Sequence, residues 1–287
     1  MNSMKQTTRN DYARRIARVT EAIFRDPARA RSLEEWAALA NFSPFHFHRI
    51  YRAMQGESIA DTIRRARLTL AARALAMSAR SVTDIALEAG YENAQSFARA
   101  FRGFVAMSPT QFRATHRAAA DFTLPSPIVV MRKDAAMNVE IVELAPIRAH
   151  LLEHKGPVAS IPETWESLWR WHMQAGLAGR ALYPIGVSYD DPEEDCGFRY
   201  CAGLVFPEGV AASGEVTIAD IVGGRYASYR HVGPYGEIGA AFQKLYGEWL
   251  PTSGHEPDDR PALEIYRNTP YDAPPEGLIT DLLIPVK

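Results

Sequence analysis

Residues 81–117 read SVTDIALEAGYENAQSFARAFRGFVAMSPTQFRATHR. Apolar residues recur at one-face helical spacing as far as Ala89, and the next residue, Gly90, can end a helix without strain in a left-handed conformation. After Tyr91 the chain restarts, and Asn93 is of a residue type that caps helices. The pattern predicts two short helices joined by a sharp turn.

The second of these helices is predicted to have an apolar inner side and a polar outer face. The inner side consists of Phe97, Ala100, Phe101 and Phe104. The outer face consists of Gln95, Ser96, Arg99 and Arg102. Amide, hydroxyl and guanidinium groups on one stripe suit base edges and phosphates in a DNA major groove. An ordinary amphipathic helix with a solvated polar face is the alternative.

Charge is divided unequally along the chain. Residues 1–120 carry 19 Lys and Arg against 10 Asp and Glu, a net charge of +9. Residues 121–287 carry 13 against 24, a net charge of -11. Eighteen of the 19 basic residues in the first part are arginine, which suits phosphate and guanine contacts. The imbalance favours a nucleic-acid partner for the first part and a different partner for the second.

Length and composition exclude several classes of protein. A chain of 287 residues predicts two domains, each long enough to bury a core. No apolar run approaches the roughly 20 residues that cross a membrane, and no secretory signal is evident at the N-terminus. Cys196 and Cys201 match no zinc or redox spacing. We therefore expect a cytoplasmic protein with no membrane partner, cofactor or metal.

The pattern of residues 81–117 has an earlier copy. Ser32 is a predicted cap for a first helix, and Ser43-Pro44 begins a second, with proline at its permitted first position. Matching residues lie 49 or 50 positions apart in the two copies. The outward face of this earlier second helix is predicted to be Phe45, His48, Arg49 and Arg52. Two copies of a helix-turn-helix are far less common by chance than one.

An alanine-rich helix is predicted over residues 59–77, between the two copies. A rigid helical spacer would hold two recognition helices about one turn of DNA apart, roughly 34 Å. Both helices would then enter successive major grooves on one side of the duplex, so a monomer suffices geometrically, and a dimer stays open.

Residues 10–117 resemble the AraC/XylS-type tandem helix-turn-helix domain. The resemblance rests on SPFHFHRIYRAMQGES, the linking helix, DIALEAGYENAQSFARAFR and the closing SPTQFR. It implies base contacts from the first recognition helix by Phe45, His48 and Arg49. From the second it implies contacts by Ala94, Gln95, Ser96 and Arg99. Ala94 departs from the pattern, because an alanine side chain touches at most a thymine methyl group.

The acidic part contains a repeat of its own. RAHLLEHKGPVASIPETWESLWRW and RYASYRHVGPYGEIGAAFQKLYGEW align at an offset of 77 residues. Each copy is predicted to form a strand, a Gly-Pro turn, a helix and two strands. We expect the two copies to pair about a pseudo-twofold axis as an antiparallel sheet with helices, and to leave a cleft where ligand pockets commonly form.

Residues 138–287 resemble the GyrI-like small-molecule-binding domain. The matching phrases include VEIVELAPIRAHLLEHKGP, GVSYDDP, GGRYASYRHVGPYGEI and WLPTSGHEPDDRPALEIY. The predicted organisation is an all-α DNA-binding domain at 1–120, a linker at 121–137 and an α+β effector domain at 138–287. This order of domains is that of Rob-type regulators.

Glu264 is the leading candidate for a ligand contact in the acidic part. It lies within the apolar strand ALEIY, on the same face as Tyr266. A carboxylate beside aromatic rings suits a cationic or hydrogen-bond-donating ligand, and the resemblance also implies that a glutamate here lines the ligand pocket. A carboxylate that is solvated or bonded within the fold is the alternative. Further candidate walls, each of which could equally be core, are Tyr229, Trp165, Trp169 and Tyr189.

These patterns predict a transcription regulator that binds double-stranded DNA and a small amphipathic or cationic effector, with RNA polymerase as a further candidate partner. A second hypothesis makes the acidic part a hydrolase of reactive toxic compounds, with Glu264 as general base. A third makes it a module that sequesters a toxin or binds a protein.

Overall fold

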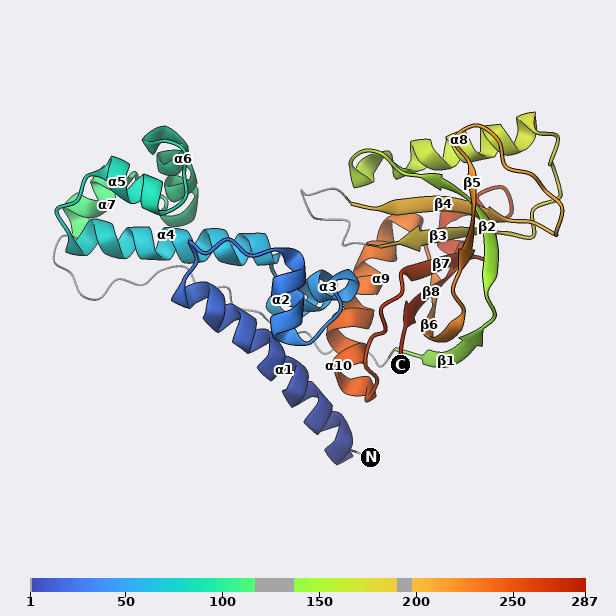
Figure 1. Cartoon of the computed structure of the whole chain (residues 1–287), viewed down its shortest axis with the longest axis horizontal. Coiled ribbons are helices and arrows are strands. Elements are labelled where there is room, and N and C mark those ends of the chain that lie inside the picture. Colours follow the sequence, from blue (N-terminus) through green and yellow to red (C-terminus); the bar gives the residue numbers. More distant parts are fainter. Residues whose placement is uncertain (1, 117–136, 190–197) are drawn as a thin grey trace.

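The computed structural model describes residues 2–116, 137–189 and 198–287. A helical part comes first, and a curved sheet with helices follows it (Figure 1). This confirms the predicted all-α part followed by an α+β part. The predicted linker at residues 121–137 lies outside the described residues, except for its last residue.

Seven helices lie within residues 2–116, the described residues of the first part. Their bounds are α1 (Asn2–Arg25), α2 (Leu33–Ala40), α3 (Pro44–Gln55), α4 (Ile59–Met77), α5 (Val82–Glu88), α6 (Ala94–Val105) and α7 (Pro109–His116). The pairs α2–α3 and α5–α6 are the two predicted helix-turn-helix units, and α4 links them (Figure 1).

The helix ends follow the residue types that the sequence offers. Ser32 accepts a hydrogen bond from the Glu35 backbone and completes a capping box at α2. Asn93 likewise accepts from the Ser96 backbone at the start of α6. Gly90 has a φ of 81°, the left-handed conformation expected at the turn between α5 and α6.

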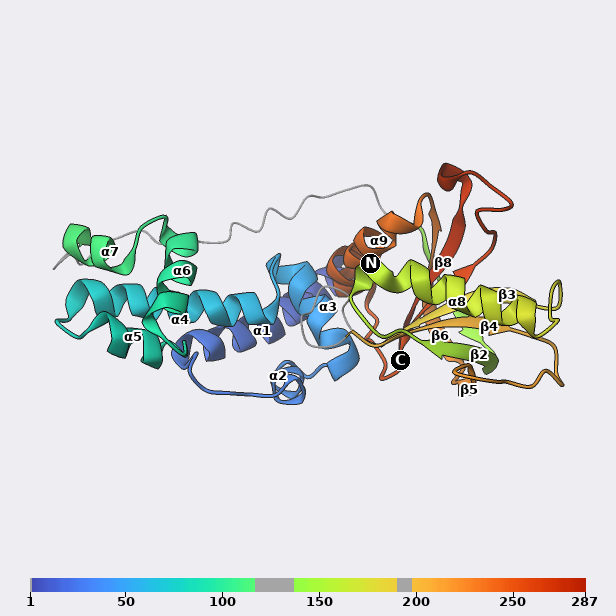
Figure 2. The same cartoon turned by 90° about the horizontal axis from the view of Figure 1, so that it is seen from above.

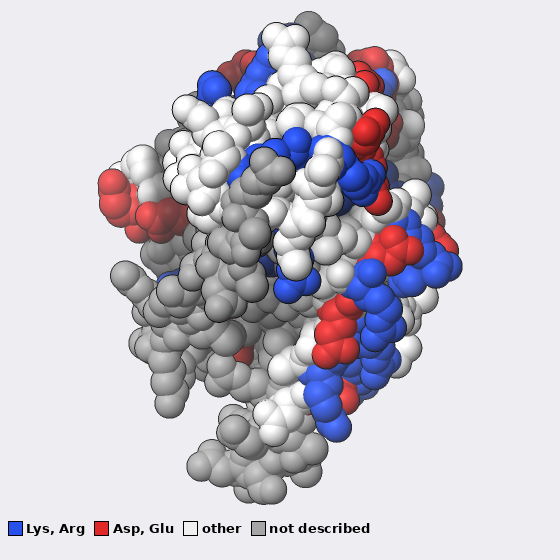
Figure 3. Space-filling view, turned by 90° about the vertical axis from the view of Figure 1, so that its left-hand side faces the viewer, with Lys and Arg blue, Asp and Glu red and all other residues white. Residues whose placement is uncertain are grey.

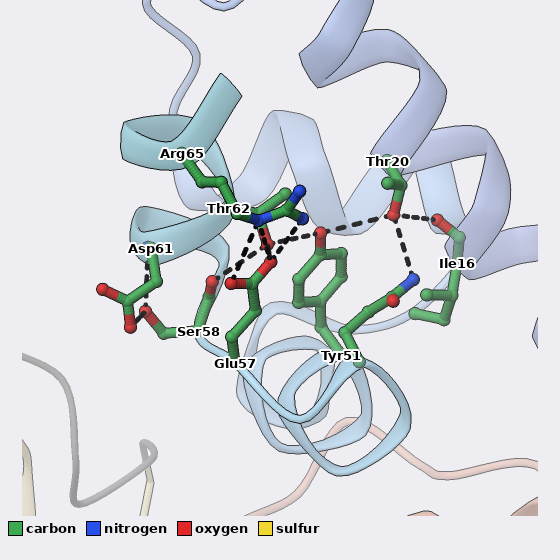
Figure 4. A network of polar contacts seen from close by, with 9 residues as sticks. Ile16, Thr20, Tyr51, Glu57, Ser58, Asp61, Thr62 and Arg65 are labelled. Carbon is green, nitrogen blue, oxygen red and sulfur yellow. Dashed lines mark hydrogen bonds and ion pairs between the residues drawn. The ribbon is translucent and has the colours of Figure 1, made fainter. Parts of the chain in front are cut away.

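A polar network fixes α3 to its neighbours in the helical part (Figure 4). The Tyr51 hydroxyl of α3 donates to Thr62 Oγ1 of α4 at 3.0 Å and lies 3.3 Å from Thr20 Oγ1 of α1. Thr62 in turn donates to Glu57, which pairs with Arg65 at 2.7 Å. Because these bonds join three helices, α3 moves together with α1 and α4 rather than alone.

The second part contains one antiparallel sheet of eight strands in the described residues. Its strands are β1 (Val139–Leu144), β2 (Ile147–Glu153), β3 (Tyr183–Ser188), β4 (Tyr200–Val205), β5 (Thr217–Ile221), β6 (Gly224–Val232), β7 (Ala262–Tyr266) and β8 (Ile279–Pro285). Helix α8 (Ile161–Gln174) follows β2. After β6, a continuous helical run comprises α9 (Ile238–Lys244), the π-helical turn η3 (Leu245–Trp249) and α10 (Leu250–Ser253).

The strand order β1-β6-β8-β7-β3-β4-β2-β5 shows the internal repeat. Strands β1–β4 form one copy and β5–β8 the other, so the first strand of each copy pairs with the second strand of the other copy. The third strands of the two copies, β3 and β7, pair at the centre of the sheet, where the predicted pseudo-twofold axis passes. Each copy has one strand more than predicted, because the short strands β1 and β5 precede the aligned phrases. Three-residue helical turns, η1 (Val158–Ser160) and η2 (Tyr235–Glu237), follow the two Gly-Pro turns.

The two helix-turn-helix units belong to two different buried cores. The unit α2–α3 shares one core with the sheet, in which Phe47 and Ile50 belong to the same cluster as Phe242 and Tyr246. The unit α5–α6 has its own core with α4 and α7, centred on Phe97, Phe101 and Phe112. In both views of the chain, α3 lies beside α9, whereas α5 to α7 lie at the far end of α4 (Figures 1 and 2).

Candidate DNA-reading and effector-binding sites

Helix α6 presents the polar face that the sequence predicts. Phe97 and Phe101 are fully buried against α4 and α7. Gln95, Arg99 and Arg102 are exposed on the other side, and Ser96 and Ala94 are half-buried. Seen from the end of the molecule that carries α5 to α7, Lys and Arg dominate the charged surface, with acidic side chains among them (Figure 3).

Helix α3 differs from this expectation. Arg49 is 7 % exposed and His48 is 8 % exposed, and Phe45 and Arg52 are half-buried. The prediction that these four side chains face solvent is wrong for this arrangement of the chain. The physical reason is that α9 and η3 of the second part pack against α3. Their role in DNA contact stays a prediction.

Arg49 extends onto the second part of the chain. Its Nη2 donates a hydrogen bond to Ser188 Oγ at the end of β3. Its guanidinium carbon lies 5.2 Å from the ring centre of Phe242 and 5.5 Å from that of Tyr246, within the range of a cation–π contact. The planar cation is thus held by two aromatic faces and a hydroxyl group.

Two more α3 side chains meet the second part of the chain. His46 stacks on Tyr246, with its Nδ1 2.9 Å from the Tyr246 hydroxyl, and burial together with the charge of Arg49 lowers the pKa of His46 to about 3. The Phe45 ring lies 6.4 Å from that of Tyr189, and the Arg199 guanidinium lies over both rings.

Close backbone packing completes this interface. Gly247 of η3 is so near α3 that a Cβ atom on it would lie 2.8 Å from the Cβ of Ala53. On α1, Arg15 forms a two-pronged ion pair with Glu256, with both N···O distances at 3.0 Å. The first helix-turn-helix unit is therefore docked on the second part by its outward face.

Glu264 lies at the centre of the second part, on the side of the sheet that carries the helices. It is 8 % exposed. Tyr266 donates a hydrogen bond to its Oε2 at 2.5 Å, and Tyr200 donates to the same oxygen at 3.4 Å. Gly186 pairs with Glu264 across β3 and β7, and a Cβ on Gly186 would lie 2.8 Å from the carboxylate. Glycine opposite the carboxylate is what leaves room for it.

Burial raises the pKa of Glu264, and three interactions oppose the rise: the bond from Tyr266, the charge of Arg49 and the bond from Tyr200. Arg49 therefore acts electrostatically on Glu264. The register explains their proximity, because Ser188, which Arg49 contacts, pairs with Ala262, two residues before Glu264. Ser188 and Glu264 are diagonal neighbours on one face of the sheet.

The structure brings some of the predicted ligand residues together and separates others. Trp165 of α8 packs edge-on against Tyr266, with ring centres 5.2 Å apart, and donates to the Tyr200 hydroxyl. Tyr229 packs against the shared core. Trp169 instead lies against His172 on α8, and Tyr189 contacts Phe45.

Where the two copies meet, Glu264 is buried beside Tyr200 and Tyr266, and the charge of Arg49 on α3 acts on it. A cavity of about 620 Å³ lies elsewhere, between α8 and the strands β2 and β5. Its lining includes Glu153, Lys155, Glu163 and Tyr189, but not Glu264. Among the described residues, no group of three or more His, Cys, Asp or Glu converges as a metal site requires. No described helix has both the length and the apolar character needed to span a bilayer.

Comparison with known proteins identifies both parts. Residues 137–287 match the model of the GyrI-like small-molecule-binding domain, and residues 36–115 match a helix-turn-helix domain of AraC type. The chain belongs to the AraC-type regulators with a GyrI-like domain. Both resemblances predicted from the sequence are therefore confirmed.

Three relatives of this GyrI-like regulator are named as transcription regulators. The "Probable transcriptional regulator YgiV" of Escherichia coli K12 is 27 % identical over 155 residues, which cover 52 % of this chain and 96 % of that protein. The "HTH-type transcriptional activator AarP" of Providencia stuartii is 32 % identical over 98 residues, covering 34 % of this chain and 73 % of that one. The "Transcriptional regulator Rob" of Salmonella typhimurium is 31 % identical over 116 residues, covering 37 % of this chain and 40 % of that one.

Sequence reasoning missed two residues of the GyrI-like domain that surround Glu264. Tyr200 donates to the carboxylate, and Tyr235 packs edge-on against Tyr266 with ring centres 5.2 Å apart. Tyr200 begins the continuous apolar run YCAGLV, which is typical of a buried strand. That run could have indicated burial, but only the strand order β7-β3-β4 places Tyr200 near Glu264.

Proposed function

We propose that this regulator reads DNA with the outward faces of α3 and α6, and that an organic cation bound at Glu264 controls that reading. The observation that carries the proposal is the carboxylate of Glu264, which is buried among Tyr200, Tyr266 and Trp165 in a small-molecule-binding domain. A buried carboxylate attracts a positive charge strongly, and aromatic rings add cation–π attraction.

The surroundings of Glu264 favour binding over catalysis. Both tyrosine hydroxyls donate to one oxygen of the carboxylate, which stabilises its ionised form and so lowers the basicity that a general base needs. The relatives are named as transcription regulators, one of them as a probable one. A ligand that stays intact after binding is therefore the expected behaviour, and the hydrolase hypothesis predicts product instead.

The test is a titration of the full chain with tetraphenylphosphonium, followed by tryptophan fluorescence, with triphenylphosphine oxide as an uncharged comparison. Glu264→Gln keeps the shape and the hydrogen-bond acceptor but removes the charge. Loss of a charged partner is worth about 1.5–3 kcal/mol, so we expect cation affinity to fall about ten- to a hundredfold. The uncharged compound should bind weakly to both proteins.

Glu163→Gln is the matched control, because Glu163 lines the separate cavity. If Glu163→Gln loses cation binding while Glu264→Gln keeps it, the assignment of the site is wrong.

The pH dependence follows from the raised pKa of Glu264. The cation binds the ionised carboxylate more tightly, so affinity should be constant above that pKa and fall below it until it reaches the affinity of Glu264→Gln. Glu264→Gln should abolish this slope.

A further inference from the structure

Resting on the proposed function, we propose that Arg49 is an internal ligand of the effector site, and that an organic cation activates DNA reading by displacing it. The proposal rests on the position of the Arg49 guanidinium group, which belongs to two sites at once. It lies on the outward face of a recognition helix, and it is held by the aromatic rings and sheet face next to Glu264.

The docked arrangement of α3 excludes a groove-bound arrangement. A recognition helix inserts its outward face into the major groove, so that face must be free. Here Arg49 and His48 on that face are less than a tenth exposed. Helix α3 is tied to α1 and α4 by the Tyr51 network, so the whole unit must leave the sheet before α3 can enter DNA.

The contacts of Arg49 describe what can replace it. They are two aromatic faces, the Ser188 hydroxyl and the negative charge of Glu264. A competitor therefore needs a delocalised positive charge and flat or aromatic groups that reach Phe242 and Tyr246. This indicates an aromatic or otherwise delocalised organic cation rather than a compact, strongly hydrated ammonium ion.

Competition for one site sets the sign of regulation. The cation binds only the undocked arrangement, and DNA binds α3 only in the undocked arrangement. Each therefore favours the other, and linkage requires that the cation increase DNA affinity by the same factor as DNA increases cation affinity. The apparent cation affinity of the intact chain is reduced by the fraction of molecules that are undocked.

Gly247→Ala tests the inference without replacing a residue that contacts Arg49 or Glu264, or one of the predicted DNA contacts. The new methyl group would lie 2.8 Å from the Cβ of Ala53 and push α3 away from η3. We expect cation affinity and DNA affinity in the absence of cation each to rise by about tenfold if about one molecule in ten is undocked in the wild type. The cation should then raise DNA affinity less than it does in the wild type.

Gly239→Ala in α9 is the matched control, because no atom lies within 4 Å of the added Cβ. It should behave like the wild type. Arg49→Ala is a second variant, which removes the internal competitor, and it should also bind tetraphenylphosphonium more tightly. A misfolded protein could bind more of a lipophilic cation but would not bind the selected DNA site more tightly, so Gly247→Ala, which should gain affinity for both, stays informative.

The measurements are tetraphenylphosphonium titration of the full chain, and fluorescence anisotropy on a DNA site selected from a random library, with and without the cation. If the cation binds through Glu264 but Gly247→Ala and Arg49→Ala bind it no more tightly than the wild type, the internal-ligand proposal is overturned and the effector site stands. A cation that weakens DNA binding would also overturn it. If no variant binds the cation, including Gly247→Ala, the effector-site assignment itself fails.

Discussion

The two helix-turn-helix units have the same local design and opposite surroundings. Phe47 and Tyr51 in α3 are as buried as Phe97 and Phe101 in α6, yet Arg49 is covered while Arg99 is exposed. The difference does not lie in the units. It lies in η3 and α9, which come almost 200 residues later and cover one unit but not the other. The repeated motif thus gives one unit whose outward face is exposed and one unit whose outward face is covered.

The largest expected effect tests whether the two units belong to separate cores. Phe101 is fully buried between Phe97 and Phe112, in a cluster that includes no residue of the sheet. Phe101→Ala should destabilise the α5–α7 region by about 3–5 kcal/mol, because it leaves a cavity. Urea unfolding should then show an early step that removes this region, while the shared core of α3 and the sheet unfolds later.

Phe47→Ala is the matched comparison, since Phe47 belongs to the shared core. It should shift the later step and leave the unfolding of the α5–α7 region largely unchanged. A single transition for Phe101→Ala, with both parts lost together, would show that the two units form one cooperative body.

Much of the local structure of the two units could be predicted from the sequence, because it depends on residues that are close along the chain. Helix ends depend on neighbours in the chain, so Ser32, Gly90 and Asn93 gave their positions directly. The two copies of each repeat also showed which side chains share a face. The covering of Arg49 could not be predicted, because it depends on the distant residues Phe242, Tyr246 and Gly247.

The residues around Glu264 show the same limit of prediction from sequence. Glu264 was recognisable as a carboxylate in an apolar strand, and Tyr266 followed from the alternation of the same strand. Tyr200 was not, because a period of two indicates the face of a strand but not which strand lies next to it. Trp169 was a candidate wall alongside Trp165, but it packs against His172 and a buried cluster, as an aromatic at helical spacing usually does.

The next effect concerns the arginines at matching positions of the two units. Arg99 is exposed on α6, so Arg99→Ala should weaken DNA binding by about 1–3 kcal/mol with or without cation. Arg49→Ala loses a predicted DNA contact but also loses a docking contact. Without cation these effects oppose each other, and the net change should be smaller than for Arg99→Ala.

With saturating tetraphenylphosphonium the wild type is already undocked, and Arg49→Ala should then weaken DNA binding as much as Arg99→Ala. Anisotropy titrations on the selected site measure all four values. Equal losses for the two variants in the absence of cation would contradict the difference between the units.

The smallest expected effect compares the first residues of the two recognition helices. Asn93 caps α6 by accepting from the Ser96 backbone at 2.8 Å. Ser43 precedes α3 in the equivalent place but makes no side-chain capping bond. Asn93→Ala should therefore lower the stability of the α5–α7 region by about 1 kcal/mol, and Ser43→Ala should change stability by less than about 0.5 kcal/mol. Urea midpoints of the early and late unfolding steps measure the two changes. Equal losses would mean that the start of α3 depends on Ser43 as much as the start of α6 depends on Asn93. Docking on the sheet would then not be what stabilises the start of α3.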